Sequence, residues 1–185
     1  MKRLCWHRGN LLVLSALLAV SASSGCELLN KQKKQKNALE FNEKIVSFNK
    51  RIHEKAFTLG DKIGKRLRSE GNITNAQLEE SLAAVKAELK AIRKEAEALK
   101  VPDHDTARDL HKQYMKFLDG QDALGEKLTT AVEIVTKPTK QPGPEQMQQM
   151  QAVIQDIEAT EKKSLNELQT VQRRFASAHG IELKF

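Results

Sequence analysis

Apolar residues recur at intervals of three and four along most of the chain after residue 36, which is the spacing of one face of an α-helix. Breaks near residues 71, 102 and 140 interrupt this pattern, and each of them contains a glycine or a proline. Such residues are typical of positions where helices end. The pattern therefore predicts four helices, at residues 37–70, 74–99, 103–136 and 144–179.

Local signals support these boundaries. Thr74 and Gln77 have the spacing of a capping box at the start of the second helix. Pro102 marks the end of that helix because the residue before a proline avoids the helical region, and Asp103 can cap the next helix. Pro144 suits the first turn of the fourth helix.

Short breaks between long amphipathic helices make each helix run back along the one before it. We therefore expect an all-α fold, an up-down-up-down antiparallel four-helix bundle over residues 37–180, followed by a tail at 181–185. The alternative is an extended coiled-coil oligomer. It is disfavoured because breaks at such regular intervals do not suit one long helix.

The first 25 residues have a different pattern. Basic residues come first, an apolar run follows at residues 11–20, and small residues precede Cys26. This is the order of a secretory signal peptide. The apolar run is only about half as long as the ~20 residues that a membrane-spanning helix needs, so a permanent transmembrane anchor is the weaker interpretation. We expect residues 1–25 to be a signal peptide.

The end of this segment, Ser23-Ser24-Gly25-Cys26, resembles the lipobox of bacterial lipoproteins, although that family usually has leucine where this chain has Ser23. The resemblance covers the first 26 residues. It implies cleavage between Gly25 and Cys26 and attachment of lipid to Cys26, which becomes the mature N-terminus. The alternative is an ordinary secretory signal cut after Ser23. That cleavage would leave Cys26 as a lone thiol in an exported protein, which such proteins usually avoid.

The resemblance also implies a location and a partner. A lipoprotein is exported and held in the cell envelope by membrane lipid, here through acylated Cys26. Glu27 follows the cysteine, whereas enteric lipoproteins retained in the inner membrane have an aspartate at that position. We therefore expect the periplasmic side of the outer membrane, in preference to the inner membrane.

The segment at residues 26–36 lies between this anchor and the first predicted helix, and we expect it to be a flexible tether. It carries Lys31, Lys33, Lys34 and Lys36. Lysines beside an anionic membrane surface gain about 1 kcal/mol each, so these side chains are candidates for membrane contact. A solvated spacer, kept extended by repulsion between the lysines, is an equal alternative.

Motifs for catalysis and metal binding are absent from the sequence. It contains no Glu-x-x-His pair, no Cys-x-x-Cys-His, no His-Glu-x-x-His and no glycine-rich phosphate loop. His104 and His111 would lie about 10 Å apart along one helix, too far to share one ion. We therefore expect no enzyme activity, no metal and no cofactor. Nucleic acid is not an expected partner, because acidic and basic residues are intermixed and Tyr114 is the single tyrosine.

Polar residues interrupt the apolar stripes of the third and fourth helices. Gln121, Glu161 and Ser164 fall at similar heights in an antiparallel pair, which predicts an interior polar layer. Four glycines lie within the first and third helices, where each costs about 1 kcal/mol relative to alanine: Gly60, Gly64, Gly120 and Gly125.

These residues have two interpretations. They could line a cavity for a small ligand. Alternatively, the glycines could allow close approach or a bend while Gln121 and Glu161 pair to set the helix register. The second is favoured because the chain is only 4% aromatic, and ligand pockets are usually rich in aromatic side chains.

The sequence thus favours a membrane-anchored envelope lipoprotein whose bundle has a structural or protein-interaction role, with another envelope protein as the expected partner. The alternative is a small-ligand carrier or sensor that uses the interior polar layer. An exposed apolar patch along one helix pair would favour the first hypothesis. A cavity lined by the four glycines would favour the second.

Overall fold

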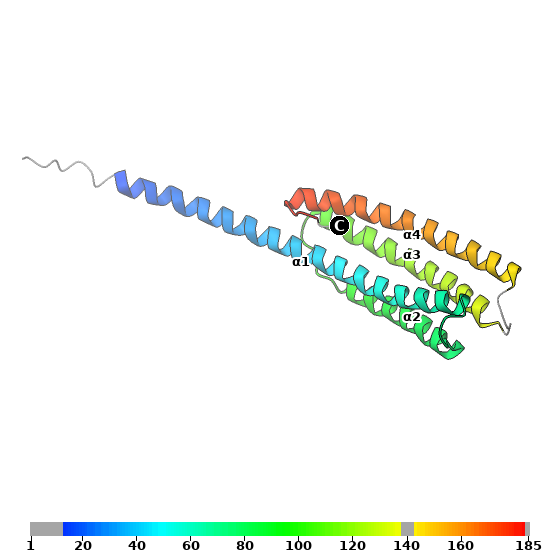
Figure 1. Cartoon of the computed structure of the whole chain (residues 1–185). Coiled ribbons are helices and arrows are strands. Elements are labelled where there is room, and N and C mark those ends of the chain that lie inside the picture. The colour runs from blue at the N-terminus through cyan, green and yellow to red at the C-terminus, as the bar shows by residue number, and fades with distance from the viewer. Residues whose placement is uncertain (1–12, 138–142, 184–185) are drawn as a thin grey trace, which may run out of the picture.

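The computed structural model describes residues 13–137 and 143–183, with side chains from Leu29 onward. The described chain forms four α-helices: α1 at Val13–Leu67, α2 at Asn75–Glu97, α3 at Asp105–Thr136 and α4 at Pro144–His179. These helices pack into one elongated bundle, and α1 continues beyond it at the N-terminal end (Figure 1). The prediction of an all-α four-helix fold is confirmed.

The predicted capping box at the start of α2 is present. The side chain of Thr74 accepts a hydrogen bond from the backbone N–H of Gln77 at 3.2 Å, and the side chain of Gln77 accepts one from the backbone N–H of Thr74 at 2.9 Å. Pro144 lies in the first turn of α4, as predicted. Gly180 ends that helix in a left-handed conformation, with φ of 62°, which glycine adopts at little cost.

The prediction that Asp103 caps α3 is wrong. The capping residue is His104, whose Nδ1 accepts a hydrogen bond from the backbone N–H of Thr106 at 3.3 Å. The Asp103 carboxylate instead accepts a hydrogen bond from the guanidinium of Arg108 at 2.9 Å. The ion pair with Arg108 holds the Asp103 carboxylate away from the free backbone N–H groups of α3. His104 therefore caps the helix, which begins at Asp105.

The prediction of a flexible tether at residues 26–36 is also wrong, because α1 runs through this segment without a break. Lysine, glutamine and leucine dominate it, and all three favour helix. Lys36 pairs with Glu40 one turn later at 3.8 Å, and Gln35 Nε2 donates to the backbone carbonyl of Gly180 at 3.1 Å. We call residues 29–37 of α1 the stem.

The predicted signal peptide and lipid-attachment site lie outside what the structure describes. Residues 1–12 are not described, and between residues 13 and 28 only the helical backbone is. Nothing in the fold therefore bears on the chemistry of Cys26.

Each helix runs in the opposite direction to the one before it. In every consecutive pair, a residue later in one helix contacts a residue earlier in the next, as expected for antiparallel helices. These contacts are Arg51–Glu95 and Lys62–Ser81 between α1 and α2, Lys86–Glu126 and Arg93–Asp119 between α2 and α3, and Lys116–Glu167 and Lys127–Asp156 between α3 and α4.

An aromatic cluster fills the core where α1 enters the bundle. Phe48 of α1 stacks on Tyr114 of α3 with ring centroids 6.0 Å apart, and Tyr114 stacks on Phe117 at 5.9 Å. Phe41 meets Phe175 of α4 edge to face at 5.7 Å. Aromatic pairs of this kind add about 0.5–1.5 kcal/mol beyond the area that they bury. The cluster therefore holds α1, α3 and α4 together at this end.

Candidate functional site

The side-chain contacts recorded between α1 and α4 are confined to one end of the bundle. They join Gln35 to Gly180, Phe41 to Phe175 and Asn42 to Gln172. Elsewhere α4 contacts mainly α3, as Lys116–Glu167 and Lys127–Asp156 illustrate. The two outer helices are therefore joined at the stem end of the bundle.

The sides of α1 and α4 that meet at this end are exposed at the other. Gly60 lies about five turns after Asn42 on the same side of α1, and Ile154 lies about five turns before Gln172 on the same side of α4. Asn42 and Gln172 are bonded to each other and buried. Gly60 is exposed, with no atom within 4 Å of where a Cβ would lie, and Ile154 is also exposed.

We call this part of the bundle the open seam and define it by Phe57, Gly60, Met147 and Ile154. Phe57 lies one turn before Gly60 and is 69% exposed, the largest fraction among the exposed large apolar side chains of the described residues. Met147 lies two turns before Ile154 on α4 and is exposed as well. The open seam therefore presents three large apolar side chains to solvent.

Apolar exposure is concentrated on these two helices. Among the side chains that the structure describes, the exposed large apolar ones are Leu29, Leu39, Val46 and Phe57 of α1 and Met147 and Ile154 of α4. Leu39, Val46 and Phe57 share one stripe, because their spacing brings each back to nearly the same side of the helix. An apolar patch along one helix pair is typical of a binding surface.

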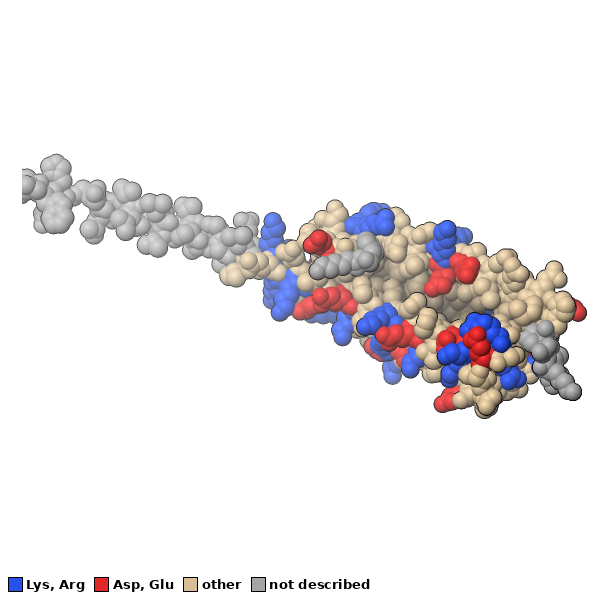
Figure 2. Space-filling view, in the orientation of Figure 1, with Lys and Arg blue, Asp and Glu red and all other residues tan. Residues whose placement is uncertain are grey.

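The first half of α4 also lacks charge. No charged residue occurs at positions 146–155, where five glutamines alternate with apolar residues. This part of α4 is an almost uninterrupted tan surface in Figure 2. Its start is held to the bundle by Gln146, whose side chain donates to the backbone carbonyl of Ile134. The surface is therefore fixed in place and uncharged.

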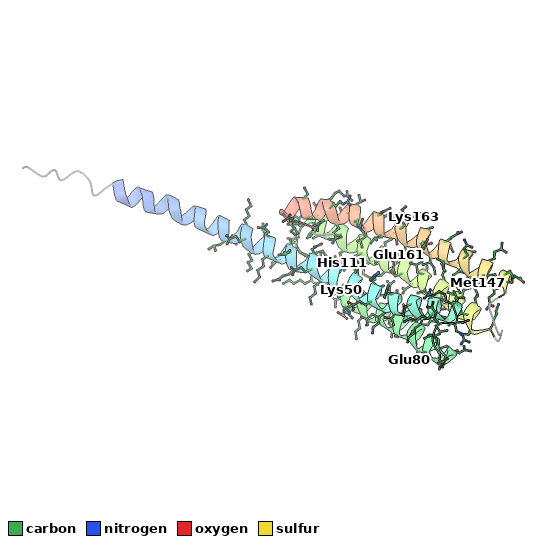
Figure 3. All side chains as sticks on the ribbon, in the orientation of Figure 1. Lys50, Glu80, His111, Met147, Glu161 and Lys163 are labelled. Atoms are coloured by element: carbon green, nitrogen blue, oxygen red, sulfur yellow. The ribbon has the colours of Figure 1, made fainter. Side chains whose placement is uncertain are left out.

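The predicted interior layer of Gln121, Glu161 and Ser164 does not form. Gln121 is buried, but Glu161 is exposed on α4 (Figure 3). Ser164 is half-buried, and its hydroxyl donates to the backbone carbonyl of Glu161 at 3.0 Å. Glu161 and Gln121 do lie at similar heights, but α1 does not cover this side of α4 there, so the carboxylate stays in water, where a charge costs least.

The glycines do not surround a shared space in the way that the sequence suggested. A Cβ added at Gly120 would lie 3.7 Å from Ser164 Cβ, and one at Gly125 would lie 4.0 Å from a methyl group of Leu89. Gly64 faces the side chain of Arg68, and Gly60 faces the open seam. Three of the four therefore have different neighbours, and the fourth has none.

Other buried polar groups do line the interface of α1, α3 and α4. Gln172 Nε2 donates to Asn42 Oδ1 at 2.7 Å, and both side chains are buried. Asn49 Oδ1, Tyr114 Oη and Gln121 Nε2 are buried atoms without a hydrogen-bond partner among the described residues. Burial raises the pKa of the Tyr114 hydroxyl, so that this group stays protonated and can donate.

The apolar pattern of the sequence does not single out Asn42, Asn49 or Gln172. A signal for the first two does exist, because Asn42 and Asn49 are seven residues apart beside the apolar stripe of α1. This spacing places them on one side of the helix.

Two histidines meet at the stem end. His104 and His179 have ring centroids 4.6 Å apart, and the hydroxyl of Thr106 lies 2.8 Å from His104 Nδ1 and 3.4 Å from His179 Nε2. Burial and the neighbouring His104 lower the pKa of His179. His111 lies elsewhere and contacts the backbone carbonyl of Ala96 at 2.8 Å. Among the described residues, no three His, Cys, Asp or Glu side chains are grouped to hold a metal ion.

The lysines near the N-terminus are all exposed on the stem: Lys31, Lys33, Lys34 and Lys36. The last turn of the stem, at Gln32, Gln35 and Lys36, lines an open pocket of about 370 Å³ together with the tail residues after α4. The stem is thus braced against the C-terminal end of the bundle.

No protein-family model, curated protein or solved structure matches the chain. A search of the described helices finds none with an apolar stretch long enough to cross a membrane. A function must therefore be inferred from the residues of this chain.

Proposed function

We propose that the protein is an envelope lipoprotein, anchored through acylated Cys26, whose helical bundle binds another envelope protein at the open seam. The observation that carries the interaction role is the exposure of Phe57 on α1 and of Met147 and Ile154 on the uncharged half of α4. The lipobox resemblance at Ser23-Ser24-Gly25-Cys26 supports the anchor, and Glu27 after the cysteine supports the outer-membrane location.

The apolar side chains of the open seam are more stable when buried against a protein surface than when exposed to water. Burying apolar area gains about 25 cal/mol per Å², and aromatic anchors such as Phe57 contribute most to protein interfaces. Gly60 lets a partner approach the backbone of α1 closely, because no atom occupies the space beside it. The glutamines around Met147 can donate and accept hydrogen bonds at the edge of such an interface.

Site-specific crosslinking in intact cells tests the interaction. A photoreactive amino acid placed at Phe57 or at Ile154 is expected to capture the same envelope protein. Glu80, which is exposed on α2 and not on either seam helix, provides the matched control (Figure 3). Equal capture at Glu80, or no capture at either seam position, would contradict the proposal.

The anchor has a separate test. Mass measurement of the exported chain is expected to show an N-terminal cysteine that carries lipid, and Cys26→Ser is expected to release the protein from the membrane fraction. An unmodified N-terminus, or one that starts before Cys26, would rule out the anchor while leaving the open seam unaffected.

A second candidate function, binding of a small ligand, is favoured by one observation. Tyr114 Oη and Gln121 Nε2 are buried donors without partners among the described residues, and such groups are costly unless something satisfies them. A ligand that accepts hydrogen bonds would supply the missing partners. Ordered water would do the same, so the two are distinguished by whether a small molecule copurifies with the unaltered chain and not with variants at these positions.

A further inference from the structure

The stem has a charge pattern that the bundle does not share. No acidic residue occurs at positions 28–39, and four lysines lie there. We propose that these lysines, which we call the lysine collar (Lys31, Lys33, Lys34 and Lys36), bind anionic lipid headgroups on all sides of α1, so that the bundle stands upright on the membrane. This inference rests on the proposed lipid anchor at Cys26.

The helical geometry determines which sides of the stem are basic. Successive residues are rotated by about 100°, so that Lys33, Lys34 and Lys36 lie at roughly 200°, 300° and 140° from Lys31. The four cations therefore surround the helix. Figure 2 shows basic residues on both edges of the stem. A groove of nucleic acid or an acidic protein surface would contact only one side, whereas a headgroup layer surrounds a helix that passes through it.

The helix also keeps the collar close to the membrane. At 1.5 Å per residue, Lys31 lies about 7.5 Å from Cys26 along the axis and Lys36 about 15 Å. The headgroup region is about 5 to 7 Å thick on each side of a bilayer, and charges act over about 8 Å of physiological salt beyond it. An extended tether, at about 3.3 Å per residue, would carry Lys36 roughly 33 Å away, beyond the reach of that field.

The stem fixes the orientation of the bundle because α1 is one helix from stem to core. Gln35 donates to the carbonyl of Gly180, so the C-terminal end of α4 also holds the stem in line. Lys36 is paired with Glu40 at the point where the stem joins the bundle. The angle between the stem and the membrane therefore also sets the angle between the bundle and the membrane.

Reversible binding to vesicles provides the test. Every residue of the core, with the side chains packed against it, lies between Ala38 and Ile181, so a chain that begins at Cys26 keeps the whole core. Its single thiol can be coupled to one 14-carbon acyl chain, which alone gives weak, reversible membrane binding. Binding is measured on phosphatidylcholine vesicles and on vesicles with equal parts of phosphatidylcholine and phosphatidylglycerol. Circular dichroism checks that each variant is folded.

The acylated chain is expected to bind the anionic vesicles about 100-fold more tightly than the neutral ones, and to lose this preference when all four collar lysines are changed to glutamine. The matched control carries the same charge change on the bundle, as Lys44→Gln, Lys55→Gln, Lys90→Gln and Lys100→Gln, and is expected to keep the preference. Each single collar change is expected to weaken binding by up to about fivefold, most at Lys31 and least at Lys36.

Two results would overturn the proposal. Equal binding to both vesicles would show that the collar is only a solvated spacer. Effects that group Lys31 with Lys34 and Lys33 with Lys36 would show that the stem lies flat with one side on the membrane. Because the acyl chain is attached chemically, a failure here is distinct from a failure of lipid attachment in the cell.

Discussion

Gln172 on α4 donates its side-chain amide to Oδ1 of Asn42 on α1, at 2.7 Å and inside the core. It is the buried polar link between the first and last helices among the described residues. Because the side-chain contacts recorded between α1 and α4 lie near this pair, the bond is at the end of the bundle opposite the open seam.

Asn42→Leu is expected to lower the free energy of unfolding by about 1–3 kcal/mol, because Gln172 would be left buried without its acceptor. The double variant Asn42→Leu with Gln172→Leu is expected to recover most of this loss, since neither polar group remains. Urea unfolding followed by circular dichroism measures both. If the double variant is as unstable as the single one, the hydrogen bond is not the cause.

Tyr114→Phe removes a buried hydroxyl that has no partner among the described residues. We expect the free energy of unfolding to stay the same or rise by about 1 kcal/mol, because the cost of burying that hydroxyl disappears while the ring still packs on Phe48 and Phe117. Gln121→Leu is expected to change stability in the same direction. Thermal and urea unfolding provide the measurement. A clear loss of stability in both variants would mean that water or a ligand satisfies these donors, and retention of a copurifying small molecule by the unaltered chain alone would favour the ligand.

The stability of the bundle is expected to fall as the pH drops below about 6.5. Burial and His104 lower the pKa of His179 below its ordinary value of 6.5, so the unfolded chain binds a proton first as the pH falls. The contribution is fully present above that value and is lost as the pH falls toward the lowered pKa of the folded state. Denaturant midpoints measured between pH 7.5 and pH 5.5 are expected to show this slope. His179→Phe keeps a ring against Phe175 and is expected to flatten it.

His53→Gln serves as the control for this experiment, because His53 is exposed on α1. A slope that persists in His179→Phe but disappears in His53→Gln would contradict the assignment.

Gly60→Ala is expected to raise the free energy of unfolding by about 0.5–1 kcal/mol. Gly60 lies inside α1, and no atom is within 4 Å of the added methyl group, so the change gains helix propensity without a clash. Gly71→Ala is the contrasting variant. It is expected to lower stability, because Gly71 has a φ of 72°, which residues with a side chain rarely adopt. Chemical unfolding of the two variants side by side tests both.

Gly60→Ala also bears on the interaction at the open seam. If a partner approaches the backbone there, this variant is expected to show weaker crosslinking from Phe57 despite its higher stability. Undiminished crosslinking would place the partner nearer to α4.

The helices of the bundle could be predicted because their boundaries depend on local chemistry. The capping box of Thr74 and Gln77 and the position of Pro144 are read directly from neighbouring residues. The start of α1 could not be found in this way, because the stem has no apolar period and its lysines suggest an extended chain. Its helix is instead supported by side-chain propensity and by the distant contact of Gln35 with Gly180.

The candidate site was harder to predict than the fold. Counting residues from the breaks places Gln121 and Glu161 at similar heights, but height does not determine which helix covers a given side. Glu161 lies about three turns before Gln172 on nearly the same side of α4. Gln172 is buried where α1 meets α4, whereas Glu161 is exposed because it lies beyond that contact. The open seam could not be predicted from the sequence for the same reason. Ile154 has the spacing of a buried position and is exposed because α1 does not cover it, whereas Phe57 lies on the exposed stripe of Leu39 and Val46.

The continuity of α1 has a mechanical consequence. A pull on its N-terminal end acts along the axis of a helix whose buried side chains extend from Ala38 to Ile63. Such a load shears the packing of many turns at once, whereas a pull across the end of a helix peels it away turn by turn. The unfolding barrier under tension is then shared along the whole interface of α1, and this barrier determines how long the fold withstands force.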